Sequence, residues 1–166
     1  MAFDIFLQID GIKGDSTDDT HKDWIEVLSF STGVSQAIGG ATSAQGALTG
    51  GRADIRDFSI VKRLDSASPV LASHCCSGKH IPNIKLKICR AMGEKTVFMV
   101  YDLKDSIVSR ITTRGAGQSE DPIPMEEVSL RFGEIHWSYT PTDPTGGGKT
   151  GAAVQAGWSA VQNKAV

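Results

Sequence analysis

The sequence lacks several features that would place it in a particular class of protein at once. No run approaches the roughly 20 consecutive apolar residues that a membrane-spanning helix needs, and the first ten residues (MAFDIFLQID) have neither a basic start nor an uninterrupted apolar stretch. The 17 Lys and Arg residues nearly balance the 19 Asp and Glu residues, with no block of like charge. We therefore expect no membrane insertion, no signal peptide, no nucleic-acid partner and synthesis in the cytoplasm.

Cysteine is also scarce. Cys75, Cys76 and Cys89 are odd in number and two of them are adjacent, so they do not form a disulfide framework. His74 and His80 lie near the adjacent pair, but neighbouring helical residues point about 100° apart and no second ligand pair completes a zinc site. The sequence predicts buried structural cysteines and no metal ion.

No arrangement typical of an active site is present. Glu126 and Glu127 are neighbours on a predicted strand, so they project to opposite faces and are poorly placed to act together as acid and base. The GGGKT at residues 146–150 resembles part of a phosphate-binding loop, yet Asp143 stands where the full pattern requires glycine, and a flexible hinge explains it better. His136 is expected to be half-buried and hydrogen-bonded. We predict no enzyme and no cofactor.

What the sequence does contain is a series of strand patterns separated by loops. Residues 14–23 are polar and acidic and predict an exposed loop, whereas Gly133 marks a predicted bulge at which the apolar parity of a strand changes. Core contributions are expected from Ile55, Phe58 and Leu64. We predict strands over residues 1–11, 23–38, 52–64, 81–89, 96–103, 106–113 and 125–140.

The strand predicted over residues 23–38 is apolar on both faces. Ile25 and Val27 occupy one face, and the other face holds Trp24, Leu28, Phe30 and Val34. A strand of this kind needs cover on both sides, and in a small domain the second cover is often another subunit. A slightly larger core is the alternative explanation for the excess of large apolar residues, which also includes Trp137 and Trp158.

One segment, residues 66–77, has the pattern of a helix. Ser68 is the expected N-cap, with Asp65 or Ser66 as alternatives one turn earlier, and Gly78 suits a left-handed end. Its predicted buried face comprises Ala67, Val70, Leu71, His74, Cys75 and Gly78. The other segments are strands that could wrap around this helix. The predicted fold is mainly β, an antiparallel barrel or two packed sheets, with the helix packed on it or plugging one side.

Two changes in composition divide the chain. Residues 39–51 are rich in small side chains, with Leu48 the only large apolar one, which predicts a flexible loop that docks on another surface. From residue 141 the chain is rich in Pro, Thr and Gly. We therefore predict a β domain over residues 1–140 with an extended loop at 39–51, followed by a hinge and C-terminal arm at 141–166 in which Trp158 is the one large anchor.

Three blocks of the chain resemble one known family. Residues 11–36 (GIKGDSTDDTHKDWIEVLSFSTGVSQ), 57–71 (DFSIVKRLDSASPVL) and 76–86 (CSGKHIPNIKL) are similar in order and spacing to the signature blocks of Hcp, the tube protein of the bacterial type VI secretion system. The similarity runs from residue 1 to about 139. It is weaker in the tail, where Gly157 and Trp158 still resemble the family's ending.

The resemblance implies a homohexameric ring that stacks into a tube, is expelled by a contractile sheath under a VgrG-type spike, and carries secreted effectors in its lumen. It implies secretion from the cytoplasm without a cleaved signal peptide. Ser31 and Thr32 are then expected to face the lumen. The expected ring-interface or stacking residues are Trp24, Phe30, Ala41, Gln45, Leu48, Arg52 and Trp158. The alternative function is a small-ligand-binding β-barrel carrier, which the dense apolar interior of the predicted strands disfavours.

Overall fold

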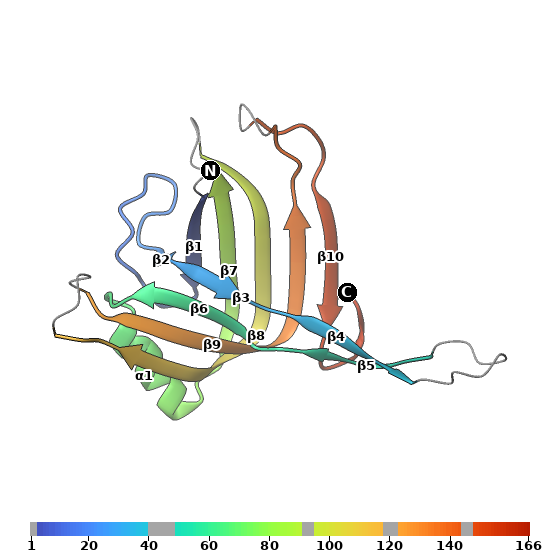
Figure 1. Ribbon diagram of the computed structural model, residues 1–166, viewed down its shortest axis with the longest axis horizontal. Coiled ribbons are helices and arrows are strands. Elements are labelled where there is room, and N and C mark those ends of the chain that lie inside the picture. The colour runs from blue at the N-terminus through green and yellow to red at the C-terminus, as the bar shows by residue number, and fades with distance from the viewer. Residues whose placement is uncertain (1–2, 40–48, 91–94, 118–122, 144–147) are drawn as a thin grey trace.

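The computed structural model describes residues 3–39, 49–90, 95–117, 123–143 and 148–166, which form antiparallel strands and a single helix (Figure 1). The predicted class, mainly β with one helix near residues 66–77, is confirmed. The elements follow in the order β1 (Phe3–Ile9), β2 (Ile25–Val27), β3 (Ser29–Ser31), β4 (Val34–Gly39), β5 (Thr49–Ile55), β6 (Phe58–Arg63), α1 (Ser68–Ser77), β7 (Ile81–Arg90), β8 (Thr96–Arg114), β9 (Met125–Tyr139), β10 (Val154–Ser159) and β11 (Lys164–Ala165).

The strand pairings form a circuit. The main sheet has the order β11-β10-β9-β8-β7-β1-β2, and β6 pairs with both β9 and β3. Leu28 alone separates β2 from β3, and its N–H donates to the carbonyl of Val61 in β6 at 2.8 Å. The pairings thus lead from β1 through β2 and β3 to β6 and return through β9, β8 and β7. The single strand predicted over residues 23–38 was wrong, because this segment serves three different partners.

The ribbon of β4 and β5 stands apart from this circuit. These two strands pair with each other and with no other strand of the described residues, and Figure 1 shows them extending away from the main sheet. The predicted loop at 39–51 overlaps the ends of both strands, since β4 continues to Gly39 and β5 begins at Thr49. Residues 40–48, including Ala41, Gln45 and Leu48, lie outside the described residues.

The two longest strands, β8 and β9, are paired along most of their length. The break predicted between residues 103 and 106 is wrong, because β8 continues through Asp105 with φ of 52°. The predicted bulge at Gly133 is also wrong. Lys104 pairs with Glu134 and Ser106 with Phe132, so the register holds there, and it shifts instead between residues 108 and 110.

The change of apolar parity in β9 is nevertheless real. Val128, Leu130 and Phe132 are buried, and the next fully buried apolar residue is Ile135 rather than residue 134. In Figure 1, β9 crosses the lower part of the molecule and then turns upward beside β10. A glycine at position 133 fits this turn, because an added Cβ would lie 3.3 Å from the side chains of Asp105 and Val161.

One apolar cluster joins the strands of the circuit. Ile55 and Phe58 are buried as predicted, but Leu64 is 36% exposed, which corrects the expectation that it packs inside. The buried members come from nearly every strand of the circuit and from the helix: Ile5, Leu7, Ile9, Ile12, Ile25, Val27, Ile55, Phe58, Ile60, Ala67, Leu71, Ile81, Ile84, Leu86, Ile88, Leu103, Val108, Val128, Leu130, Phe132 and Ile135.

Helix α1 lies against one side of the sheet and contacts β8, so the strands do not wrap around it (Figure 1). Ser68 is not its N-cap. Ala67 holds that position without a side-chain bond of its own, and the Asp65 carboxylate, one of the two alternatives, accepts the Ala67 N–H at 2.9 Å. Gly78 ends the helix in the left-handed conformation, with φ of 61°, as predicted.

The buried face of α1 is narrower than predicted. Leu71 is fully buried, but Val70 is 39% exposed and Cys75 only half-buried. The reason is that a helix on the outside of a single sheet layer is covered on one side only, so fewer of its positions meet a neighbour.

A buried ionic cluster fixes the start of the helix. Lys62 is 0% exposed, and its Nζ donates to Asp65 Oδ1 at 2.7 Å and to Ser68 Oγ at 2.9 Å. The same Nζ lies 2.9 Å from Oε2 of Glu126, which also accepts the Ser68 hydroxyl. Ser68 therefore serves this network instead of capping. Because buried charges require partners, the cluster ties β6, β9 and the helix together.

Removing one partner of this cluster should destabilise the fold strongly. We expect Lys62→Met to lower the free energy of unfolding by about 3–5 kcal/mol, because Glu126 would remain buried without its cation. The double variant Lys62→Met/Glu126→Leu removes both charges and should recover most of the loss. Urea unfolding at one fixed protein concentration measures both effects. A single variant as stable as wild type would contradict this account.

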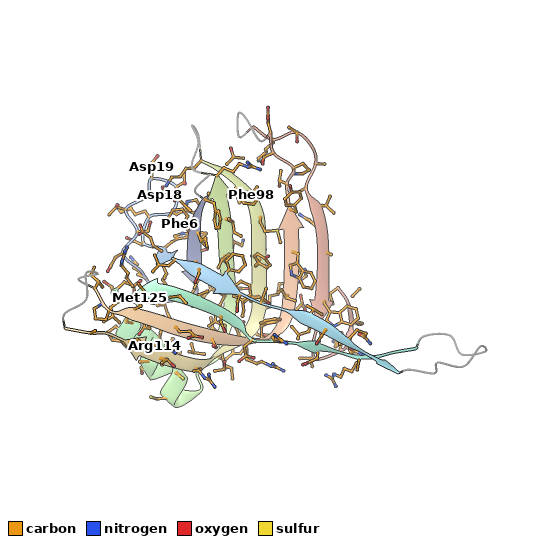
Figure 2. All side chains as sticks on the ribbon, in the orientation of Figure 1. Phe6, Asp18, Asp19, Phe98, Arg114 and Met125 are labelled. Carbon is orange, nitrogen blue, oxygen red and sulfur yellow. The ribbon has the colours of Figure 1, made fainter. Side chains whose placement is uncertain are left out.

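The predicted exposed loop at residues 14–23 is partly buried, which corrects the expectation. His21 is 2% exposed and stacks on Phe6 of β1 at 4.4 Å between ring centroids. Its Nδ1 lies 2.9 Å from Oδ1 of Asp18, whose other carboxylate oxygen pairs with Lys95. Figure 2 shows Phe6 and Asp18 on the side of the molecule where this loop covers β1. A polar sequence can thus cover a strand when its charges pair with one another.

The hydrogen bond from Lys95 holds the pKa of Asp18 well below its usual range. A carboxyl whose pKa is lowered by folding contributes stability above its unfolded pKa, about 3.9, and this contribution is lost as the pH falls toward the folded value. We expect Asp18→Asn to reduce stability at pH 7 and to lie closer to wild type at pH 3. Urea unfolding midpoints of both proteins at the two pH values test this, and a gap that widens in acid would refute it.

Candidate assembly and lumen surfaces

Ser31 and Thr32 line a polar groove on the surface of the circuit. Strand register explains how the groove forms: Ser31 of β3 pairs with Ser59 of β6, and Ser59 pairs with Ser129 of β9. Ser109 lies beside Ser129, at the register shift of β8. We call this the serine groove, and its hydroxyl residues are Ser31, Thr32, Ser59, Ser109 and Ser129.

Charged side chains complete the serine groove. Arg56, Asp57 and Arg110 also line it. Asp57 is already occupied, because its Oδ2 accepts the Ser109 hydroxyl at 2.5 Å and its Oδ1 accepts a hydrogen bond from Arg131 at 3.0 Å. The remaining lining is therefore dominated by hydroxyls and by two guanidinium groups. Sequence reasoning found Ser31 and Thr32 but missed these arginines, which become neighbours of the serines only through strand pairing.

The two aromatic residues expected at a ring interface are half-buried by other residues of the same protomer. Phe30 is half-buried and stacks parallel to Phe58 with 5.8 Å between ring centroids. Trp24 is also half-buried. The Nζ of Lys87 lies 4.7 Å from the centroid of its ring, and the ring of His21 is nearly perpendicular to it with 4.9 Å between centroids. Their part in an interface stays a prediction.

The exposed apolar side chains of the same segment are Leu28 and Val34, at 45% and 56%. Both belong to the second apolar face that the sequence indicated, and they are the two members of that face that the protomer leaves exposed. Other large apolar side chains exposed at more than 45% were not singled out from sequence: Phe3, Tyr139, Val154, Val161 and Val166. No local signal distinguishes them from core residues, since each occurs in or beside an ordinary strand or turn.

Arg52 and Trp158 connect the ribbon and the tail to the main sheet. The guanidinium of Arg52, in β5, donates to the carbonyl of Ala160 at 2.8 Å. Trp158 is a half-buried residue of β10, where it pairs with Ile135 and packs against the core. Residues 154–159 are thus a strand of the nine-stranded sheet. The division of the chain at residue 140 and the interface roles of Arg52 and Trp158 stay predictions.

The cysteines and the GGGKT segment form no metal or phosphate site among the described residues. Cys89 is buried, and burial raises the pKa of its thiol, but Cys76 is exposed, which corrects the expectation of buried cysteines. Across the described ranges, no group of three or more His, Cys, Asp or Glu side chains could hold a metal ion. The turn around Lys149 leads into β10 rather than into a helix.

The remaining predicted residues behave as ordinary structural side chains. Glu126 is buried and Glu127 half-buried, on opposite faces as expected. His136 is half-buried and its Nε2 is hydrogen-bonded to Glu134. The hydrogen bonds from His136 and Lys104 lower the pKa of the Glu134 carboxyl. Within the ranges described, no helix has the length and apolar character needed to cross a membrane.

Solved structures of known proteins share this fold over the whole chain. One described as a type six secretion system protein has a TM-score of 0.92 and 34% identity, covering 99% of this chain and 100% of its own. Hcp1 from Salmonella typhimurium has a TM-score of 0.82 and 32% identity, with full coverage of both chains. The fold and the sequence together define a type VI secretion protein.

The family follows from the sequence comparisons. A family model described as "Type VI secretion system effector, Hcp" matches residues 6–139. The Hcp1 protein of Pseudomonas aeruginosa is 38% identical over 164 residues, which is 98% of each chain. This chain therefore belongs to the Hcp family, and the predicted resemblance is confirmed.

Close packing of the tail on β9 should make Gly157 difficult to replace. A Cβ at this position would lie 2.5 Å from Nδ1 of His136 and 2.8 Å from the carbonyl of Val166. We expect Gly157→Ala to lower the free energy of unfolding by about 1–3 kcal/mol, because backbone or ring must shift. Gly33→Ala is the matched control, since its Cβ would meet only the side chain of Arg56 at 3.5 Å. Equal unfolding midpoints for the two variants would show that the tail is packed loosely.

Proposed function

We propose that this chain is the structural subunit of a type VI secretion tube, which forms hexameric rings that stack and are expelled from the cell. Its membership of the Hcp family supports this role. In this proposal the partners are further copies of the chain, a VgrG-type spike, contractile sheath proteins and secreted effectors. The subunit is made in the cytoplasm, leaves through the secretion system without a cleaved signal peptide, and performs no catalysis.

The observation that carries the proposal is the exposure of two large apolar side chains in residues 23–38. Leu28 and Val34 are exposed in the protomer although both lie in a segment of alternating apolar residues. Burial of apolar surface contributes about 25 cal/mol per Å² removed from water. A neighbouring subunit that covers these side chains would therefore stabilise the contact between the two subunits. Ring closure also covers strand edges, which are otherwise sites of aggregation.

The serine groove supports the assignment of a lumen surface. Ser31 is exposed and Thr32 partly exposed, and the groove around them is lined by hydroxyl and charged groups. A surface of this composition remains hydrated and can contact a passing protein without holding it by apolar burial. We place this groove toward the channel of the ring, where it would meet effectors.

Light scattering of the purified protein tests the ring. We expect a single species of about 106 kDa, six times the 17.7 kDa protomer. Val34→Asp should reduce the mass toward that of the protomer, because it would bury a charge without a partner between subunits. Val34→Thr, similar in volume, should retain the ring.

Two results would count against the proposal. A monodisperse monomer at tens of micromolar wild-type protein would remove the tube as the function and favour the small-ligand carrier. If Val34→Asp still forms rings, the interface between subunits does not include Val34 and must lie on another face. Circular dichroism of each variant checks that the protomer is still folded.

A further inference from the structure

Two arginines of the serine groove have no partner among the described residues. Arg56 and Arg110 are both exposed, and neither guanidinium makes a hydrogen bond or an ion pair with any described side chain or carbonyl. The third nearby arginine, Arg131, differs because it is bound to Asp57 and to the carbonyl of Ile55. The groove therefore carries uncompensated positive charge in a chain whose net charge is -2.

The side chain of Arg56 lies at the β3 end of the groove. Its backbone N–H donates to the carbonyl of Gly33 at 2.9 Å, and its Cδ lies 3.5 Å from the position of a Cβ at Gly33. The aliphatic part of the side chain thus lies over Gly33, next to Thr32. Packing of the stem reduces the entropy that the guanidinium would lose on binding a ligand.

Arg110 stands at the opposite end. It pairs with Ser129 in the β8–β9 register, and from Ser129 the row continues through Ser59 of β6 to Ser31 of β3. Neighbouring strands lie about 4.8 Å apart, so the row from β8 to β3 spans roughly 14 Å. Four residues of extended peptide cover roughly 13 Å. The two ends of the groove are therefore separated by the reach of a short extended segment.

The hydroxyls of the serine groove are only partly engaged. Ser59 and Ser129 bond to each other at 2.9 Å, and Ser109 donates to Asp57. The hydroxyls of Ser31 and Thr32 have no hydrogen bond to a described residue and stay available to a ligand. Guanidinium groups bind carboxylates through two parallel hydrogen bonds, and hydroxyls can donate to a peptide carbonyl.

We propose that the serine groove binds acidic segments of partner proteins, with one carboxylate at Arg56, a second at Arg110 and the peptide backbone against the hydroxyls of Ser31 and Thr32 at the Arg56 end. The proposal deepens the proposed function as a secretion tube and rests on it for the identity of the partner, a secreted protein that passes through the ring. It assigns charge as the property by which such a partner is selected.

A peptide titration tests the acidic ligand. The probe is a dye-labelled octapeptide of Gly and Ser with two Glu residues four positions apart, and the matched peptide carries Gln at both positions. We expect the Glu peptide to bind wild-type protein at least tenfold more tightly at low salt and to lose affinity as salt increases. Arg56→Gln and Arg110→Gln should each weaken binding about fivefold to tenfold.

The control variant is Arg114→Gln. Arg114 is an exposed arginine of the same strand as Arg110, but it lies opposite Met125 at the far end of β8 and outside the groove (Figure 2). We expect this variant to bind the Glu peptide as wild type does. Equal affinity for the Glu and Gln peptides, an Arg114→Gln effect as large as that of Arg56→Gln, or no binding at millimolar peptide would each overturn the proposal.

Two further measurements separate the alternatives. A single-stranded oligonucleotide of equal charge that binds more tightly than the Glu peptide would assign the groove to nucleic acid and refute the protein ligand. Light scattering on the titrated samples distinguishes the two proposals of this chain. If a monomer binds the peptide through its arginines, the acidic ligand is supported and the hexameric ring is refuted. If the protein forms a ring that does not bind the peptide, the ring is supported and the acidic ligand is refuted.

Discussion

The pairing of β8 with β9 is the interaction on which the rest of the structure depends. β7 pairs with β8 on one side, and β6 and β10 pair with different parts of β9 on the other. The helix packs on β8 as well. Because β9 turns midway, its two halves carry separate partners, and a single antiparallel pair organises both the core and the tail. Loss of this pairing would therefore release several elements together.

Charge is used inside this framework in two opposite ways. Lys62 and Glu126 are buried and fully paired, which ties the helix to the sheet at the cost of desolvating both groups. Arg56 and Arg110 are exposed and have no partner among the described residues, so they contribute little to stability and remain free to bind. The buried pair stabilises the protomer, whereas the two exposed arginines are available to bind a partner.

The apolar residues divide in the same manner. Phe30 and Trp24 were expected at the interface between subunits, yet most of their contacts are within the protomer. Leu28 and Val34 are the exposed members of that face. A sequence pattern identifies an apolar face that must be buried. It does not show which residues of that face are buried within the protomer, because this depends on neighbours such as Phe58 that are distant in the chain.

The sequence by itself determined the features that arise from near neighbours: strand periodicity, the helix end at Gly78 and the membership of a family recognised from three ordered blocks. Local backbone preferences and side-chain alternation act over a few residues, so they can be recognised before folding. Only the tertiary structure decided that residues 23–38 divide among three partners, that Lys62 and Glu126 meet, and that serines and arginines of four segments form one groove. These depend on strand register, which aligns residues that are far apart in the sequence.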